Sequence, residues 1–231
     1  MDSRRRALLN GKFLSYTGEY SLYGSGAKGY IVLKSSGVLN IRKKTCDLCL
    51  VAGGKNGTNG RWSTVIHVGG DDYEEWRNGD SGKGGGVTNY KEQELSGEYN
   101  VIIGNAEKST SVGDSYSASG AASTPTYPFD DRDFQVADLA SNGYVVSKTG
   151  TLDGGSGLAN TGNGGGGSSK SYGAGNGGSG VVIIRWGYNS EKITVATDGD
   201  MLLLSSDGMS VSGDGDTLII TAKGISTTMA R

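Results

Sequence analysis

The chain has 231 residues, of which 42 are glycine and 2 are proline, and apolar residues make up 35% of it. Its 22 Lys and Arg and 24 Asp and Glu leave a formal net charge of -2, which gives no electrostatic attraction to nucleic acid or to an anionic membrane. No apolar stretch approaches the roughly 20 residues that span a bilayer, and the first residues lack the apolar core of a signal peptide. We therefore expect a protein that is made in the cytoplasm, does not bind nucleic acid and does not insert into a membrane.

Glycine dominates the composition, since average usage is roughly 7%. The sequence lacks the strict Gly-X-Y period and the proline content of collagen. Several apolar strand patterns argue against a disordered linker. The glycine is therefore expected to belong to a folded, all-β protein.

The N-terminal segment, residues 1–12, is basic and too short to fold alone. Arg4, Arg5 and Arg6 precede a short apolar run, which is enough for a turn or two of helix or for an extended arm. The segment is either an arm that docks onto a partner or a frayed end.

Residues 13–51 alternate aromatic or branched side chains with polar ones and are interrupted by glycine and serine clusters, which is typical of strands joined by hairpin turns. Cys46 and Cys49 form a C-x-x-C in the last of these strands. In an extended chain their Cα atoms would lie about 10 Å apart with the side chains on opposite faces, which prevents a disulfide. No second pair of ligands exists, so packing in the core is favoured over a zinc or redox role.

Residues 53–97 combine glycine clusters with one predicted strand, 63–68, which contains the single histidine, His67. No nucleophile motif accompanies His67, so a structural or surface role is favoured over a catalytic one. The acidic and aromatic run 71–76 is predicted to be a solvated surface loop. The alternatives for this run are a cation site or a pair of glycosidase carboxylates.

Residues 97–104 predict another strand, and residues 105–176 contain few apolar side chains and many of Gly, Ser, Thr and Asn. A structureless loop of this length would be abnormal in a compact domain. Glycine runs such as 164–167 bury little apolar surface and lose much backbone entropy on ordering, so they need neighbours. A bundle of polyproline-II segments that exchange backbone hydrogen bonds would supply these neighbours, and side chains pointing out of it would form a display surface. A flexible Gly/Ser linker is the alternative.

The run 181–186 is a continuous series of mainly β-branched residues, which predicts a strand buried on both faces. The composition changes after Gly187, and residues 198–204 recur as 214–220, which indicates a β-repeat that turns at Asp-Gly steps. Turn formation is favoured over calcium binding there, because the EF-hand spacing is missing. We expect this repeat to pack against a copy of itself or a partner, since isolated hairpins are marginally stable.

Two motifs, in order and spacing, resemble the glycine-rich tail-fibre and tail-tip domains of phages and prophages. The opening motif is carried by residues 30–33, 36–41 and 47–54, and the closing motif by 160–167 and 177–185. The closing N-T-G-N-G-G-G-G and G-G-S-G-V-V-I-I-R are the most specific part of a resemblance that covers roughly residues 13–187. Lys55 and Asn56 depart from it, because they stand where the family has a long glycine run, and they predict a reduced polyglycine bundle.

The resemblance implies a jelly-roll-like β-sandwich with polyproline-II-like or polyglycine-II-like loops, in an oligomeric and often trimeric appendage. We accordingly expect a docking arm at 1–12, a glycine-rich β-sandwich at 13–187 and a C-terminal β-hairpin region for oligomerisation at 188–231. The glycines expected to be structural are Gly53, Gly54, Gly164, Gly165, Gly166, Gly167, Gly177, Gly178 and Gly180.

Several aromatic residues fall in segments predicted to be polar or glycine-rich loops, where rings can stack on sugars or anchor a protein contact. Local packing over glycine backbone is an equal alternative. These residues are Trp62, Tyr73, Trp76, Tyr90, Tyr116, Tyr127 and Tyr172.

The sequence thus predicts a non-enzymatic structural protein of a bacteriophage virion, a tail-fibre or tail-tip component that contributes to host-surface attachment. Its expected partners are other virion proteins, copies of itself and a glycan or protein on the host cell surface. The alternative is a capsid or head-fibre decoration, or a baseplate protein, without receptor binding. No cofactor or metal is expected, and an envelope-degrading enzyme is the weakest hypothesis because neither a carboxylate pair nor a nucleophile motif is evident.

Overall fold

The structure is a computed structural model that describes residues 13–25, 27–66, 69–170 and 172–188, together with the strands that lie between 194 and 230. It has two compact units, Met1–Gly187 and Tyr188–Arg231. Strands contain 44% of the residues and helices 5%. The predicted all-β class is therefore confirmed.

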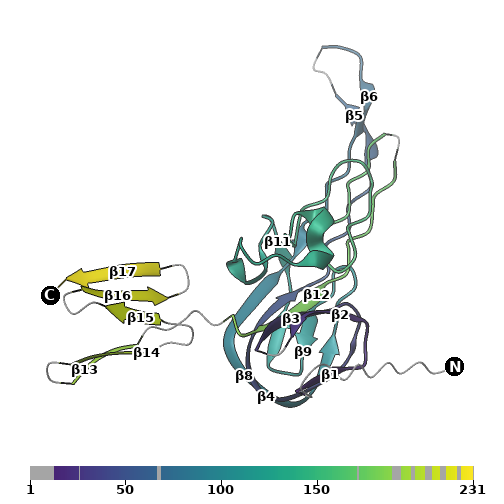
Figure 1. The fold of residues 1–231 in the computed structure, drawn as a ribbon. Coiled ribbons are helices and arrows are strands. Elements are labelled where there is room, and N and C mark those ends of the chain that lie inside the picture. Colours follow the sequence, from purple (N-terminus) through teal and green to yellow (C-terminus); the bar gives the residue numbers. More distant parts are fainter. Residues whose placement is uncertain are drawn as a thin grey trace. The chain divides into compact units, whose positions relative to one another are not determined.

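The first unit is built on one eight-stranded antiparallel sheet with the order β10-β9-β8-β4-β12-β3-β2, to which β1 is added by pairing with β4 (Figure 1). The jelly-roll arrangement is not confirmed by this order. The strands of the sheet are β1 (Leu14–Tyr16), β2 (Tyr20–Ser25), β3 (Lys28–Leu33), β4 (Gly37–Val51), β8 (Val87–Ile102), β9 (Thr110–Val112), β10 (Tyr116–Ala118) and β12 (Val181–Trp186).

The long strands β4 and β8 pair along most of their length, with irregularities in β4 between Ile41 and Lys44 and between Cys46 and Leu48. β8 begins ten residues before the strand predicted at 97–104. Its first half was missed because its side chains are mostly polar and half-buried or exposed, so no apolar alternation marks it.

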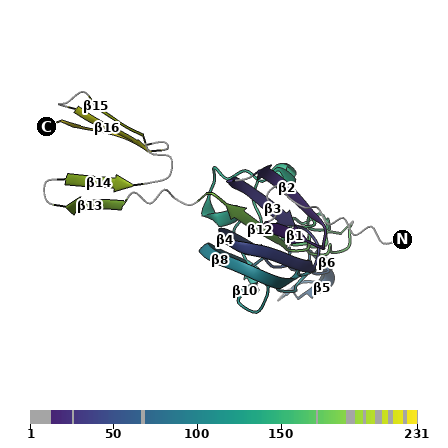
Figure 2. The same cartoon turned by 60° about the horizontal axis from the view of Figure 1, so that its bottom comes forward.

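β12, the last strand of the unit, lies between β3 and β4 and pairs with both, so it is a central strand of the sheet (Figure 2). All six of its residues are buried, which confirms the predicted burial on both faces. One face belongs to the main core, whose buried members include Leu33, Leu48, Leu50, Val182 and Ile184.

The other face of β12 is covered by residues 124–147, which we name the covering segment. It contains the short 3-10 helices η1 (Pro128–Asp130) and η2 (Ala137–Asn142). Phe134 of this segment packs edge-on against Tyr30 of β3, with ring centroids 5.1 Å apart. Part of the long region 105–176, which contains few apolar side chains, therefore covers the second face of the sheet.

A buried arginine joins the covering segment to the sheet. Arg185 of β12 donates from Nε to Asp47 Oδ2 and from Nη1 to Asp131 Oδ2, each at 2.9 Å. Its guanidinium carbon lies 4.1 Å from the ring centroid of Phe129 and 5.1 Å from that of Phe134. Carboxylates and aromatic faces thus replace the water that a buried cation would lose.

The two cysteines of β4 are both buried and free. Cys46 belongs to the main core, whereas Cys49 lies on the other face, next to Phe129 of the covering segment. Burial raises the pKa of each thiol to about 12. The prediction that they pack in the core on opposite faces without a disulfide is confirmed.

Extended glycine-rich segments run side by side away from the main sheet (Figure 1). We name them the glycine bundle, and they comprise residues 53–60, 79–86, 147–157, 161–168 and 173–180. Segment 161–168 is buried along its whole length and exchanges backbone hydrogen bonds with each of the other segments. It is therefore the centre of the bundle.

The hydrogen bonds of this central segment repeat every three residues. Gly165 donates to the Lys55 carbonyl at 2.8 Å, and Ser168 donates to the Thr58 carbonyl at 3.1 Å. The same three-residue spacing recurs between the central segment and two other segments. Gly164 and Gly167 donate to the carbonyls of Lys148 and Thr151, and Gly79, Gly82 and Gly85 donate to the carbonyls of Ser168, Gly165 and Gly162. A polyproline-II helix has this period and no internal hydrogen bonds. The predicted bundle is confirmed, and the flexible-linker alternative is wrong for these residues.

Lys55 and Asn56, which were predicted to reduce the bundle, do not interrupt it. A Cβ on Gly54 would lie 2.0 Å from the Asn163 carbonyl oxygen, and one on Gly57 would lie 2.0 Å from that of Gly166. Only every third residue of an outer segment faces the centre, so the two residues between these glycines carry side chains outward without loss of contact.

The remaining strands form small sheets. In the first unit, β5 (Arg61–Val65) pairs with β6 (Tyr73–Arg77), and β7 (Gly84–Gly85) pairs with β11 (Ala121–Ala122). In the second unit, β13 (Thr194–Asp198) pairs with β14 (Met201–Ser205), and β15 (Ser210–Gly213), β16 (Thr217–Ala222) and β17 (Ile225–Ala230) form an antiparallel sheet. The strands that flank both Asp-Gly steps pair as the repeat predicts, and the residues between them lie outside the described residues.

Candidate functional site

The glycines predicted to be structural all lie in the bundle or where it joins the sheet. A Cβ on any of them would come within 2.8 Å of a neighbouring backbone atom. They are Gly53, Gly54, Gly164, Gly165, Gly166, Gly167, Gly177, Gly178 and Gly180. These glycines allow neighbouring backbones to approach closely. They therefore have a structural role, and any binding site must be formed by the side chains around them.

A two-stranded hairpin projects from the end of the bundle that is remote from the main sheet (Figure 1). It consists of β5 and β6, and we name it the outer hairpin. Its first strand continues bundle segment 53–60 and its second leads into segment 79–86. At its base the Gly60 N–H donates to Ser168 Oγ, which ties the hairpin to the end of the central segment.

Two tryptophans face each other across the outer hairpin. Trp62 pairs directly with Trp76, and the rings meet edge-to-face with centroids 5.7 Å apart and an interplanar angle of 75°. Lys170 Nζ lies 5.1 Å from the Trp62 centroid. Trp76 packs over Gly60, where a Cβ would be 2.6 Å from the indole, and its Nε1 donates to Asn78 Oδ1 at 2.9 Å. Trp76 is thus held in place, while Trp62 remains 52% exposed.

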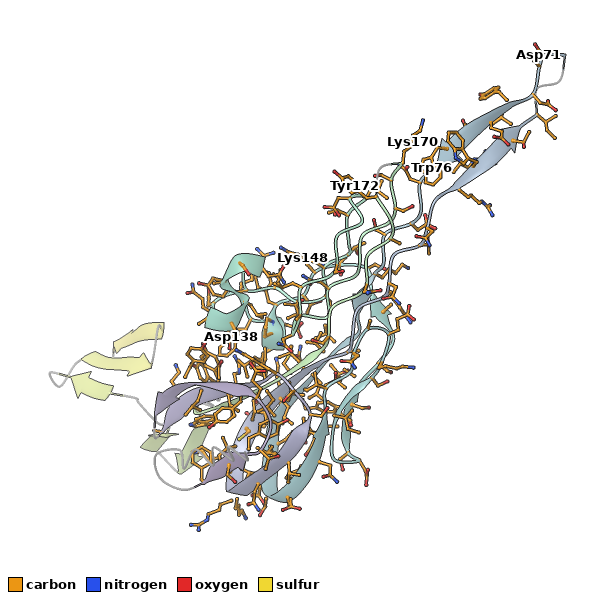
Figure 3. All side chains as sticks on the ribbon, turned by 90° about the vertical axis from the view of Figure 1, so that its right-hand side faces the viewer. Asp71, Trp76, Asp138, Lys148, Lys170 and Tyr172 are labelled. Carbon is orange, nitrogen blue, oxygen red and sulfur yellow. The ribbon has the colours of Figure 1, made fainter. Side chains whose placement is uncertain are left out.

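Most of the large exposed apolar side chains lie in the bundle, in the outer hairpin or in residues that adjoin them, rather than in the main sheet. Ile66 and Tyr172 are 76% and 63% exposed, and Tyr73 is 50% exposed. The large exposed hydrophobic residues of the described chain are Trp62, Ile66, Tyr73, Ile102, Leu152, Leu158 and Tyr172, and only Ile102 lies in the main sheet. Contiguous exposed apolar patches are typical of surfaces that bind another molecule. Figure 3 shows Trp76, Lys170 and Tyr172 at the outer part of the bundle.

Residues 71–76 were predicted to be a solvated surface loop. They are exposed or half-buried, but the loop assignment is wrong for residues 73–76, since Tyr73–Arg77 is strand β6. Each face of this strand carries one aromatic and one acidic side chain, Tyr73 with Glu75 and Trp76 with Glu74, so no apolar face marks the strand in the sequence. Glu75 forms an exposed ion pair with Arg77, with Oε1 and Nε 3.3 Å apart. Within the described residues, no group of three or more His, Cys, Asp or Glu side chains is placed to hold a metal ion.

The other predicted contact residues lie away from the hairpin. Tyr90 of β8 and Tyr116 of β10 meet edge-to-face at 5.0 Å and pack against the main core, and the Tyr90 hydroxyl donates to the Ser117 carbonyl at 3.0 Å. Tyr127, in the covering segment, has the guanidinium of Arg132 5.3 Å from its ring centroid. The structure therefore gives Tyr90 and Tyr116 a packing role and places them in strands, not in the predicted loops.

Some predicted residues cannot be placed. Arg4, Arg5, Arg6 and His67 lie outside the described residues. Conversely, four residues near the bundle and the outer hairpin were not predicted. Ile66 follows β5 and Lys170 lies beside Trp62, whereas Leu152 belongs to segment 147–157 and Leu158 follows that segment. Leu152 and Leu158 each interrupt a polar or glycine-rich stretch, and Ile66 belongs to the predicted strand 63–68, whereas nothing in the sequence distinguishes Lys170.

Comparisons with models of known protein families, with curated protein sequences and with solved structures found no match. Among the residues that the structure describes, no helix is long and apolar enough to cross a membrane.

Proposed function

We propose that this chain is a non-enzymatic structural protein of a bacteriophage virion, a tail-fibre or tail-tip component whose outer hairpin contacts the host surface. The observation that carries the proposal is the exposed aromatic and apolar surface at the outer end of a hydrogen-bonded glycine bundle. Anchoring rings held on a rigid support lose little conformational entropy when they bind, which favours attachment.

Trp62 is the leading contact residue of this surface. Its indole is half exposed, is oriented by Trp76 and lies next to a cation, Lys170. Tyr73 pairs with Val65 and lies three residues from Trp76 along β6. It therefore adds an aromatic ring on the face of the hairpin opposite the two tryptophans. Aromatic rings with polar neighbours suit either a cell-surface glycan or a protein as the ligand.

The second unit supports a role in assembly. It consists of a two-stranded and a three-stranded sheet, and sheets this small are marginally stable without a further layer. We propose that it joins copies of the chain, with a trimer favoured, and that the N-terminal arm with Arg4, Arg5 and Arg6 docks onto other virion proteins.

Binding of the purified protein to a glycan array and to a panel of bacterial cells tests the attachment role. Replacement of Trp62 by Ala is expected to weaken binding by about thirtyfold, the effect of losing roughly 2 kcal/mol at a central contact. Tyr127→Ala is the matched control, since it removes an aromatic ring away from the hairpin and is expected to leave binding unchanged.

Binding that survives both Trp62→Ala and Tyr73→Ala in folded protein would contradict the role of the hairpin. A failure to bind any glycan or cell would favour the architectural alternative, in which the chain decorates a capsid or forms part of a baseplate. Electron microscopy of assembled particles labelled with an antibody against the chain would then locate it, and absence from every particle would overturn the virion proposal.

A further inference from the structure

The glycine bundle is rich in a chemically fragile dipeptide. Asn-Gly is the sequence at which asparagine deamidates most readily, because glycine leaves its backbone nitrogen unshielded by a side chain, and asparagine is among the thermolabile residues. The Asn-Gly steps of the described chain are Asn56-Gly57, Asn59-Gly60, Asn78-Gly79, Asn142-Gly143, Asn163-Gly164 and Asn176-Gly177. All but Asn142-Gly143 lie in the bundle or at its junction with the outer hairpin.

Deamidation begins when the glycine nitrogen loses its proton and attacks Cγ of the preceding asparagine. The N–Cγ bond forms, the Cγ–Nδ2 bond breaks and ammonia leaves with the proton. One water then opens the resulting succinimide to aspartate or isoaspartate. The attack requires a peptide group that is free to rotate and a nitrogen that is free to lose its proton. A hydrogen bond from that N–H to a fixed acceptor opposes both.

The structure supplies such an acceptor to the glycine of every Asn-Gly step that it describes. Gly57, Gly79 and Gly164 donate to the carbonyls of Gly175, Ser168 and Lys148 at 2.9, 2.9 and 2.8 Å. Gly60 donates to Ser168 Oγ, Gly177 to Asn56 Oδ1 at 2.8 Å, and Gly143 to the Ala140 carbonyl at 3.2 Å.

Several of the asparagine side chains are held as well. Asn56 Oδ1 is the acceptor for Gly177, so one Asn-Gly step restrains another. Asn59 Oδ1 accepts from the Ala174 N–H at 3.1 Å, and Asn163 Oδ1 accepts from the Lys148 N–H at 3.0 Å. These hydrogen bonds tie each asparagine side chain to a neighbouring segment and restrain the rotation that the attack on Cγ requires.

We propose that the glycine bundle suppresses deamidation at its own Asn-Gly steps, so that these asparagines react only after the bundle opens locally. The inter-segment hydrogen bonds then have a second role besides holding the segments together. They make a chain with many fragile steps chemically durable. This inference does not depend on the proposed attachment role.

The test is a deamidation time course on the full chain, held at pH 8 and 37 °C and followed by peptide mass spectrometry with detection of isoaspartate. Synthetic peptides that span each Asn-Gly step give the unprotected rate. In the folded chain the bundle steps are expected to react at least about tenfold more slowly, because reaction through local opening is slowed by the opening equilibrium. Folded protein that deamidates at the peptide rates would overturn the proposal.

A local variant separates the hydrogen bond from folding in general. Ser168→Ala removes the Oγ acceptor of Gly60 but keeps the backbone carbonyl that accepts from Gly79. Deamidation at Asn59 is expected to rise at least severalfold while that at Asn78 stays unchanged, and Ser169→Ala is the matched control. A folded Ser168→Ala protein with an unchanged rate at Asn59 would contradict the mechanism. The wild-type time course decides the proposal even if this variant does not fold.

Discussion

The glycines from Gly164 to Gly167 are required by the distance between neighbouring backbones rather than by turn geometry. A Cβ on Gly164 would lie 1.8 Å from the Gly82 carbonyl oxygen, and one on Gly165 would lie 2.1 Å from that of Gly175. Both oxygens belong to backbone that is hydrogen-bonded on other sides, so neither can move without breaking further bonds. Even the smallest side chain is therefore excluded from the centre of the bundle.

Gly165→Ala is expected to lower the free energy of unfolding by about 3 kcal/mol, the upper range for overpacking in a close-packed interior. Gly173→Ala is the matched control, because its Cβ would meet no atom within 4 Å, and its effect is expected to stay within about 0.5 kcal/mol. Chemical denaturation of the two variants measures the difference. Equal stability of both would mean that the central segment is not close-packed.

At the scale of elements, the covering segment depends on polar contacts to stay on the sheet. Asp131 is partly exposed and binds Arg185, and its Oδ1 also accepts from the backbone N–H groups of Asp133 and Phe134. Burial opposes ionisation of this carboxyl, but the hydrogen bonds from Arg185 and the backbone outweigh it and lower its pKa. The ionised form of the Asp131 carboxyl is thus the form that binds the covering segment to Arg185 of the sheet.

This lowered pKa predicts how stability changes with pH. A carboxyl whose pKa is lower in the folded than in the unfolded chain adds stability above the unfolded pKa of about 4, and that stability is lost as pH falls through the folded pKa. Asp131→Asn is therefore expected to reduce Tm modestly at pH 7 and to converge with wild type at low pH. Asp133→Asn, an exposed neighbour, is the control. A constant Tm difference between wild type and Asp131→Asn at every pH would contradict this prediction.

The sequence predicted one strand of the outer hairpin, at 63–68, which overlaps β5, but it did not predict the second strand, β6. β6 carries aromatic and charged residues on both faces, so the alternation that identifies a half-buried strand is missing. Pairing of Trp62 with Trp76 and the bond from Gly60 to Ser168 become visible only when both ends of the hairpin are placed on the bundle.

At the scale of the whole molecule, the chain divides at Gly187 into units of different character. The described part of the first contains a buried sheet core and the bundle, and the described strands of the second form a two-stranded and a three-stranded sheet. We therefore expect the second unit to join copies of the chain.

A chain truncated after Gly187 tests this assignment. It is expected to keep the Tm of the first unit, because the core cluster and the bundle lie entirely within it, and to be monomeric by light scattering while the full chain is oligomeric. A monomeric full chain, or an oligomeric truncated chain, would contradict the assembly role of the second unit.

The sequence by itself determined the all-β class, the burial of residues 181–186 on both faces and the separation of Cys46 from Cys49, because these follow from the alternation of apolar side chains along a strand. It also indicated that glycine runs such as 164–167 need neighbouring segments. Each of these features depends on side-chain chemistry that is local in the chain.

Only the tertiary structure decided which segments are neighbours in the bundle, that Lys55 and Asn56 fit into it, and that Trp62 and Trp76 meet at its outer end. Glycine carries no side chain to specify a partner, and backbone hydrogen bonds are the same for every residue. The pairing of Gly165 with Lys55 and Gly82 is therefore set by how the sheet positions the ends of each segment, which no local pattern records.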